Sequence, residues 1–314
     1  MRTIITAAAA AILLASQSTA LASEPAPALI YKPDPGEELD AETLANINNF
    51  LIALTPQQGD VALKGAEATI NIPSTHYFLD SEDAQSILVD AWGNPPDPEI
   101  LGMIFPAGST PLNVGSWGAT VYFSDDGYVS DEDAHKIDYD DMMKDLKKGQ
   151  KSNNKWREEN GYEPVDIIGW AETPFYNDET KKMFWAKELK FGEAELNTLN
   201  YDIRVLGRKG TLVISFIATM NELPDIRDDA PAVLEMAHFN PGATYADYQP
   251  GVDKKAAYGI AGLVGGGLLL KKTGLLAGLL LFGKKFIVII LAGLVAAFGA
   301  VKRFFMHKGQ DTNT

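Results

Sequence analysis

Hydrophobic and polar residues recur with two different periods along the middle of the chain, and each period predicts a different kind of element. From Asp40 to Leu54, apolar side chains return every three or four residues behind an aspartate that can cap a helix. Beyond this predicted helix, apolar and polar residues alternate in short runs, which is typical of half-buried strands. Such strands are predicted at residues 60–63, 68–72, 76–79, 100–105 and 119–123.

Four further strand signals follow one another in the second half of the chain, with short connections between them. They lie at residues 165–172, 183–189, 200–206 and 211–220. Gly207-Arg208-Lys209-Gly210 stands in the last connection and is typical of a hairpin turn. Consecutive strands with short links favour an antiparallel meander. With helices predicted at 81–92, 130–148, 152–159 and 229–237, the pattern predicts an α+β fold, an antiparallel β-meander with packed helices.

The helix predicted to start at Ser130 depends on the acidic residues that follow this serine. Ser130 can cap a helix, and Asp131 and Asp133 would then lie in its first turn, where the helix dipole favours negative charge. Lysines near Lys148 would complement the other end of the dipole. The same acidic stretch, Asp125 to Asp141, is also the best candidate for a calcium site, although the EF-hand order of ligands is missing.

The predicted meander carries aromatic side chains on both faces. Met183 and Trp185 share one face of their strand, and Phe184 lies on the other. Packing in a hydrophobic core explains this pattern, because aromatic residues dominate protein cores. A groove that binds a peptide or a glycan is the alternative interpretation.

The first 22 residues have the three parts of a secretory signal peptide. Arg2 provides the positive start, residues 4–15 form an apolar run, and Ala20-Leu21-Ala22 fits the cleavage rule. We therefore expect residues 1–22 to be removed on export and residues 23–255 to form a soluble extracytoplasmic domain.

Residues 286–301 form sixteen consecutive positions without a charge, bounded on both sides by pairs of basic residues. A helix of this length spans roughly 24 Å, and snorkelling lysine and arginine stems would extend it toward the ~30 Å of a bilayer core. The sequence therefore predicts a C-terminal transmembrane helical segment, with the buried core helix as the alternative. Residues 307–314 would follow as a polar tail.

Residues 256–306 as a whole are predicted to be membrane-associated apolar helices, which contact lipid. Lys271 and Lys272 interrupt the first part, so it either lies in the membrane interface or forms short helices against the main span. Two GxxxG spacings allow close helix contacts and predict self-association or an envelope-protein partner; they are formed by Gly262, Gly266, Gly274 and Gly278. One crossing would leave the C-terminus in the cytoplasm, and two would return it to the outside.

Charge is distributed unevenly along the chain. The segment from Glu24 to Lys255 carries 41 acidic and 19 basic residues, whereas residues 256–314 carry one acidic and seven basic residues. The acidic body repels nucleic acid and anionic lipid headgroups, while the basic, apolar tail is attracted to such headgroups. We therefore expect no nucleic-acid partner and a membrane contact made by the tail.

The sequence predicts no catalytic, cofactor-binding or metal-binding residue. The chain has no cysteine, which excludes disulfides, thiolate nucleophiles and cysteine metal sites. No P-loop or dinucleotide-binding motif is present, and Gly115-Ser116-Trp117-Gly118 lacks the spacing of a nucleophile elbow. Each histidine lacks a second ligand at a metal-binding spacing; the four are His76, His135, His238 and His307.

Several long segments together resemble the bacterial domain-of-unknown-function 2167 family. They are ATINIPSTHYFLD (68–80), WGNPPDPEILGMIFP (92–106), GYVSDEDAHKIDYDD (127–141), GWAETPFYNDETKKMFWAKELKFG (169–192), NYDIRVLGRKG (200–210) and YADYQPGVDKKAAYGIAGL (245–263). The resemblance implies a predicted membrane-anchored envelope protein of a Gram-negative bacterium. It implies no reaction and no site residues.

These patterns predict an anchored protein of the bacterial inner membrane whose soluble domain faces the periplasm. We interpret it as a domain that binds or scaffolds an envelope component. The alternative is a carboxylate-dependent hydrolase that acts on cell-wall material, since aspartates and glutamates are abundant enough for two to meet in the fold.

Overall fold

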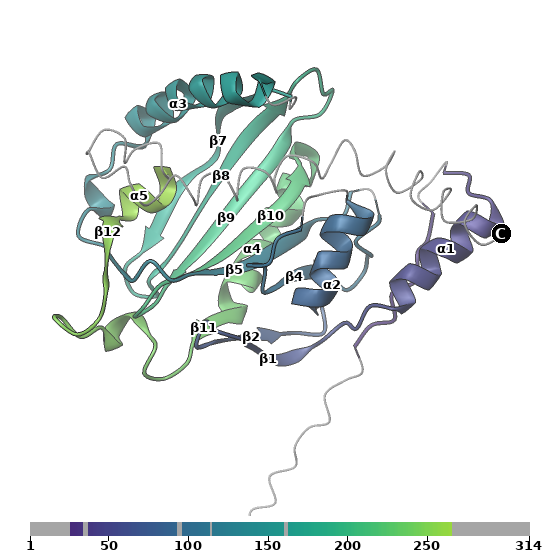
Figure 1. Ribbon diagram of the computed structural model, residues 1–314, viewed down its shortest axis with the longest axis horizontal. Coiled ribbons are helices and arrows are strands. Elements are labelled where there is room, and N and C mark those ends of the chain that lie inside the picture. Colours follow the sequence, from purple (N-terminus) through teal and green to yellow (C-terminus); the bar gives the residue numbers. More distant parts are fainter. Residues whose placement is uncertain (1–25, 34–36, 93–95, 114, 160–162, 266–314) are drawn as a thin grey trace, which may run out of the picture.

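The computed structural model describes residues 26–33, 37–92, 96–113, 115–159 and 163–265 (Figure 1). The helices are α1 (Ala41–Ile52), α2 (Ser81–Gln85), α3 (Tyr139–Glu159), α4 (Leu223–Met236) and α5 (Ile260–Gly265), with short helical turns η1 (Ser86–Ala91), η2 (Ala134–Lys136), η3 (Met220–Glu222) and η4 (Tyr245–Asp247). The strands are β1 (Gly59–Leu63), β2 (Ala68–Ile72), β3 (His76–Asp80), β4 (Gly102–Pro106), β5 (Gly118–Ser124), β6 (Tyr128–Ser130), β7 (Val165–Asn177), β8 (Lys182–Phe191), β9 (Thr198–Leu206), β10 (Thr211–Thr219), β11 (Ala237–Phe239) and β12 (Lys255–Gly259).

A seven-stranded antiparallel sheet forms the centre of the molecule, with the strand order β3-β4-β5-β10-β9-β8-β7. Strands β7 to β10 run as a meander, which confirms the predicted α+β fold with antiparallel strands. Strand β10 then pairs with β5, so that Val213 lies opposite Tyr122. This long-range pairing joins the meander to the strands of the first half.

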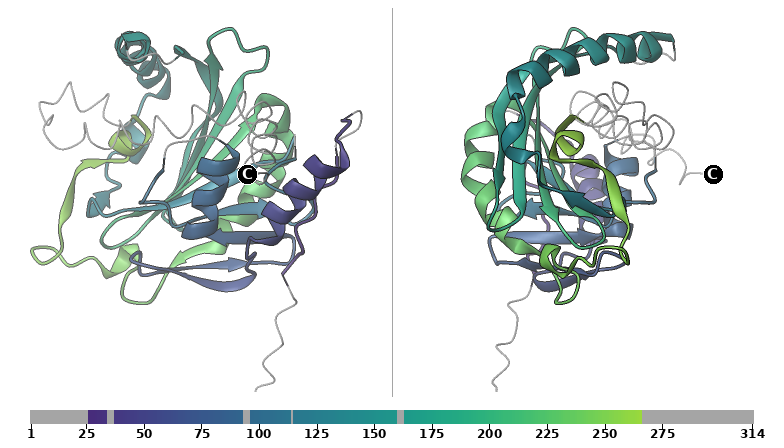
Figure 2. Two further views of the ribbon diagram at one scale, coloured as in Figure 1. Left: turned by 45° about the vertical axis from the view of Figure 1, so that its right-hand side comes forward. Right: turned by 90° about the vertical axis from the view of Figure 1, so that its left-hand side faces the viewer.

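Alternation along the strands builds two different cores, one on each face of the sheet. In β10, Leu212, Ile214 and Phe216 contact one cluster, whereas Val213 and Ile217 contact another. The first cluster lies under α4 and the small sheet β1-β2-β11, and the second lies under α1, α2 and η1. Figure 2 shows α4 on the side of the sheet opposite α5 and β12. The sheet is therefore covered from both sides.

The predicted helix at the N-terminus has the expected start and the expected buried face. The side chain of Asp40 accepts a hydrogen bond from the backbone of Thr43, and the apolar residues Ile47 and Leu51 are buried. Met183 and Trp185 lie together in one cluster, and Phe184 packs against another, as the alternation predicts. Trp185 is buried in that cluster.

The prediction of a helix that starts at Ser130 is wrong, as is the break before Ser152. Ser130 ends β6, and a single continuous helix, α3, runs from Tyr139 to Glu159. Asp138 caps this helix by accepting hydrogen bonds from the backbone N–H groups of Asp140 and Asp141 at 3.0 and 2.9 Å. Asp131 and Asp133 accept hydrogen bonds from Lys181 and from the start of α5, so they do not form a first helical turn after Ser130.

The folded body continues past Lys255, where the sequence analysis placed the start of the membrane-associated region. Strand β12 pairs in parallel with β6, and α5 follows it directly. Ala256, Ile260 and Val264 are buried in one cluster with residues of α3. No helix among residues 26–265 that the structure describes is both long and apolar enough to cross a membrane. The predicted span at 286–301 and the polar tail at 307–314 lie outside the described residues.

Candidate functional site

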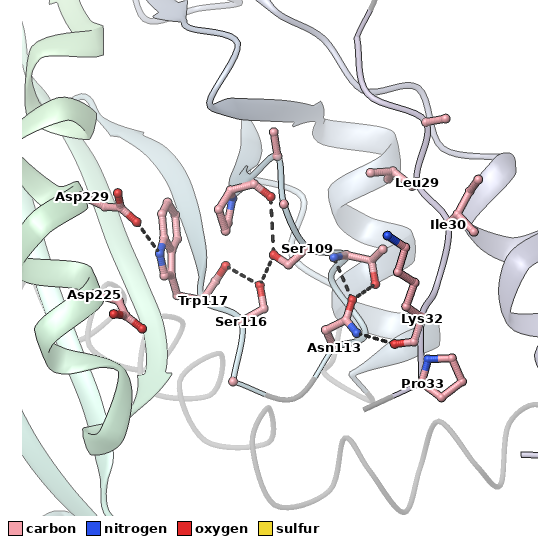
Figure 3. A pocket seen from close by; sticks show the side chains of 16 residues that line it. Leu29, Ile30, Lys32, Pro33, Ser109, Asn113, Ser116, Trp117, Asp225 and Asp229 are labelled. Carbon is pink, nitrogen blue, oxygen red and sulfur yellow. Dashed lines mark hydrogen bonds between the residues drawn. The ribbon is translucent and has the colours of Figure 1, made fainter. Parts of the chain in front are cut away.

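A pocket of about 670 Å³ opens where the N-terminal segment meets the β4–β5 loop and the first turns of α4 (Figure 3). The N-terminal segment contributes Leu29, Ile30 and Lys32. The α4 helix contributes Asp225 and Asp229 from the opposite wall. The β4–β5 loop forms the wall between them with Pro106, Ala107, Gly108, Ser109, Thr110, Asn113, Gly115, Ser116 and Trp117.

Hydrogen bonds between lining residues hold the β4–β5 loop in shape. The hydroxyls of Ser109 and Ser116 are 2.6 Å apart, and the Ser109 hydroxyl also donates to the carbonyl of Pro106. The Asn113 side-chain oxygen accepts from both the backbone and the hydroxyl of Thr110 at 3.0 and 2.8 Å. The Asn113 amide donates to the carbonyl of Lys32 at 3.0 Å and so ties the loop to the N-terminal segment. These bonds connect the lining residues to one another and to the N-terminal segment.

Two carboxylates one helical turn apart form the acidic wall of the pocket. Asp225 lies in the first turn of α4, where the helix dipole stabilises its negative charge. Asp229 accepts a hydrogen bond from the indole N–H of Trp117 at 3.0 Å. Trp117 is itself fixed by packing on Phe216, with a distance of 4.8 Å between ring centroids. The position of Asp229 is thus set by the core.

His76 lies next to this wall with its ring buried. Its Nδ1 is 2.9 Å from the hydroxyl of Thr75, and its ring centroid is 5.6 Å from that of Trp117. Burial lowers the pKa of His76, and the negative charge of Asp229 opposes this effect only in part. Because the usual pKa of histidine is about 6.5, a lowered value keeps this ring neutral at pH 7. Its Nε2 has no hydrogen-bond partner within the described part of the chain.

The pocket therefore presents acceptors on one side and a cation on the other. The carboxylates of Asp225 and Asp229 can accept hydrogen bonds, and the lysine at position 32 can donate them. Serine, threonine and asparagine groups lie between these charges. This arrangement suits a polar ligand that carries both donors and acceptors, held against an apolar patch from the N-terminal segment.

Sequence reasoning missed this site because its residues come from three distant segments. Gly115-Ser116-Trp117-Gly118 lacks the spacing of a nucleophile elbow, yet the structure places Ser116 and Trp117 in the pocket wall. The helix predicted at 229–237 begins at Asp229 and leaves Asp225 outside it. In the structure α4 begins at Leu223, so both aspartates lie in the helix. The only signal in the sequence was the i, i+4 spacing of these two aspartates on a helical face.

The acidic stretch from 125 to 141 is distributed over separate contacts instead of one site. Asp126 binds the hydroxyls of Ser124 and Tyr258. Asp131 accepts from the ammonium of Lys181 and the hydroxyl of Tyr176, each at 2.7 Å. The carboxylate of Asp133 accepts from the first backbone N–H groups of α5. Within residues 26–265 as described, no three metal-ligating side chains gather.

The histidines and the predicted partner glycines occupy separate places. His135 lies 2.7 Å from Asp178 on the surface, and the Nδ1 of His238 faces the carbonyl of Met236. Gly262 lies in α5, where a Cβ atom would be 2.5 Å from that of Tyr258. Close packing inside the body therefore accounts for this glycine. The remaining positions, Gly266, Gly274, Gly278 and His307, lie outside the described residues.

The fold and the pocket define an α+β protein with a hydrogen-bonded polar pocket beside its antiparallel sheet. A family model described as "Protein of unknown function (DUF2167)" matches residues 55–295, and the chain belongs to this family, which confirms the resemblance. No curated protein matches the chain in sequence.

Similar solved structures include a cyanobacterial PsbP and two Mog1 proteins. The solution structure of PsbP (CyanoP) from Synechocystis sp. PCC 6803 has 10% identity and a TM-score of 0.34, over 60% of this chain and 92% of that one. The Ran-binding protein Mog1p of Saccharomyces cerevisiae has 9% identity and a TM-score of 0.24, over 60% and 96%. A mutant of the protein Mog1 has 11% identity and a TM-score of 0.29, over 59% and 96%.

Proposed function

We propose that this chain is an exported, membrane-anchored protein whose folded body binds a component of the bacterial cell envelope in the pocket beside α4. The observation that carries the proposal is the hydrogen-bonded lining formed by Ser109, Asn113 and Ser116. A lining that is ordered before binding lowers the entropic cost of taking up a ligand. The signal peptide predicted at 1–22 and the apolar tail at 256–306 support an inner-membrane location with the body in the periplasm.

The chemistry of the pocket favours cell-wall fragments as ligands. Fragments of the wall's glycan and peptide carry hydroxyls, amides, amino groups and carboxylates on one molecule. Amino and hydroxyl groups match the carboxylates of Asp225 and Asp229, and a ligand carboxylate matches Lys32. The apolar side chains of Leu29 and Ile30 supply the contact surface.

A second candidate function is a hydrolase that acts on the same material. It is favoured by the presence of two carboxylates, Asp225 and Asp229, in one pocket. Pairs of carboxyl groups about 5–10 Å apart carry out glycoside hydrolysis, one as an acid and the other as a base or nucleophile. The bond from Trp117 to Asp229 favours a fixed binding wall, because it occupies a carboxylate that catalysis would require.

Calorimetric titration of the full mature chain with purified muropeptides separates these two functions. We expect binding without new products by mass spectrometry, and we expect Asp225→Asn to weaken it roughly 10- to 100-fold, since a hydrogen bond to a charged group contributes about 1.5–3 kcal/mol. Asp228→Asn, on the exposed side of the same helix, is the matched control and should bind like the parent chain. Cleaved products that disappear in Asp225→Asn would favour the hydrolase. Absence of any binding would overturn the proposal.

A further inference from the structure

Polar side chains occupy the middle of the sheet face opposite α4. The register places Trp185 of β8 beside Asp202 of β9, and Lys187 beside Asn200. Because alternate residues of a strand face the same side, these four share one face with Arg204. We call these five residues the β8–β9 polar cluster. In Figure 1 strands β8 and β9 lie between α2 and α5. The apolar residues of α2 belong to one hydrophobic cluster, and those of α5 belong to another.

Two cations in the β8–β9 polar cluster face a single carboxylate. Asp202 accepts from the Ser215 hydroxyl at 2.6 Å and from Arg204 at 3.2 Å, and Lys187 Nζ lies 3.8 Å away. Burial acts to raise the pKa of Asp202, but the two cations and Ser215 outweigh burial and hold that pKa below its usual range. Arg204 also lies over the ring of Trp185 at 4.8 Å. Burial lowers the pKa of Lys187, and the charge of Asp202 opposes this effect only in part. The cluster thus places two basic side chains beside one carboxylate.

Two buried polar groups of the cluster have no hydrogen-bond partner among the described residues. Asn200 is 1% exposed, and neither atom of its amide makes a hydrogen bond to any residue that the structure describes. Trp185 is also 1% exposed, and its indole N–H makes no hydrogen bond to any residue that the structure describes. Buried polar groups are almost always paired, because an unpaired one destabilises the fold. The cluster thus offers two unused donors and one unused acceptor beside a lysine.

We propose that the β8–β9 polar cluster binds the terminal carboxylate of a peptide. The carboxylate oxygens accept from Lys187, the Asn200 amide nitrogen and the indole of Trp185. The amide N–H that precedes a terminal carboxylate donates to the Asn200 carbonyl oxygen. A phosphate ion could also accept hydrogen bonds from these donors. It has no amide N–H to donate to the Asn200 side-chain oxygen, so we expect it to bind more weakly than the peptide. The cluster lies on the face of the sheet opposite α4, so this site is separate from the proposed pocket.

Titration of the full mature chain, in detergent micelles, with acetyl-alanyl-alanine tests the proposal. We expect the free acid to bind at least ten times more tightly than its C-terminal amide and than inorganic phosphate. Asn200→Leu should lower this affinity at least tenfold while leaving the urea midpoint unchanged or raised, because it removes an unpaired amide. Lys187→Gln should lower the affinity similarly, and Lys190→Gln, at the exposed end of β8, should not.

Several results would overturn the site. One is failure of the free acid to bind at millimolar concentration. Another is equal binding of the amide or of phosphate, which would remove the role assigned to the carboxylate and to the Asn200 oxygen. A lower urea midpoint in Asn200→Leu, or wild-type affinity in both this variant and Lys187→Gln, would mark the two residues as structural. None of these outcomes depends on the pocket beside α4, whose variants are different.

Discussion

Gly118 in β5 shows how a single missing side chain sets the packing beside the pocket. A Cβ atom at this position would lie 2.5 Å from Phe105 Cε1 and 3.1 Å from the ring of Trp92. Both rings belong to the core under α1 and α2. Strand β5 can therefore approach these rings only because residue 118 is a glycine, and the β4–β5 loop that leads into β5 depends on this approach.

We expect Gly118→Ala to lower the free energy of unfolding by about 1–3 kcal/mol, since a forced methyl group displaces packed rings. Gly169→Ala is the matched control, because Gly169 also lies in a strand and its added Cβ meets no atom within 4 Å. This control should change the free energy by less than about 0.5 kcal/mol. Urea unfolding with an unchanged m-value measures both. Equal midpoints for the two variants would contradict the packing described here.

At the scale of elements, local sequence patterns predicted most helices and strands but could not predict which distant strands pair with each other. The meander β7 to β10 followed from alternation and short links. The pairing of β5 with β10, which sets Val213 opposite Tyr122, joins residues far apart in the sequence and leaves no local signal. The same holds for the parallel pair β6 and β12. The candidate pocket could not be predicted for the same reason, because its walls come from three segments that are far apart in the sequence.

Helix α3 shows a failure with a different cause. The acids after Ser130 satisfy the rules for a helix start, but tertiary contacts use them elsewhere. Asp131 binds Lys181, and Asp133 caps α5, so the chain stays extended or turned until Asp138. Tertiary hydrogen bonds therefore override a local capping signal of similar strength.

Replacement of the two rival caps distinguishes them experimentally. Asp138→Ala should lower the free energy of unfolding by about 1 kcal/mol, because it leaves the N–H groups of Asp140 and Asp141 without their acceptor. Ser130→Ala should leave it nearly unchanged, since Ser130 ends β6 and caps no helix. Thermal unfolding followed by circular dichroism measures both variants. A larger decrease in the free energy of unfolding for Ser130→Ala than for Asp138→Ala would favour a helix that starts at Ser130.

At the scale of the whole molecule, the charge boundary in the sequence and the end of the packed body in the structure lie at different residues. Net charge changes sign after Lys255, whereas the packed body extends to Gly265. The residues between these two points are apolar, yet Ile260 and Val264 are buried against α3 and not left for lipid. Hydrophobicity alone could not reveal this, because a core and a bilayer favour the same side chains.

Two truncations test where the body ends and what the remaining tail does. A chain that ends at Gly265 keeps the buried contacts of Ala256, Ile260 and Val264, so it should unfold like the full chain. A chain that ends at Lys255 loses all three and should be destabilised by on the order of 3 kcal/mol or more, the scale of a large apolar deletion. Urea unfolding of the purified chains measures this difference. In cells, both truncated chains should leave the carbonate-resistant membrane fraction, because each lacks the predicted span at 286–301. Retention of the Gly265 chain in that fraction would place the anchor within the folded body.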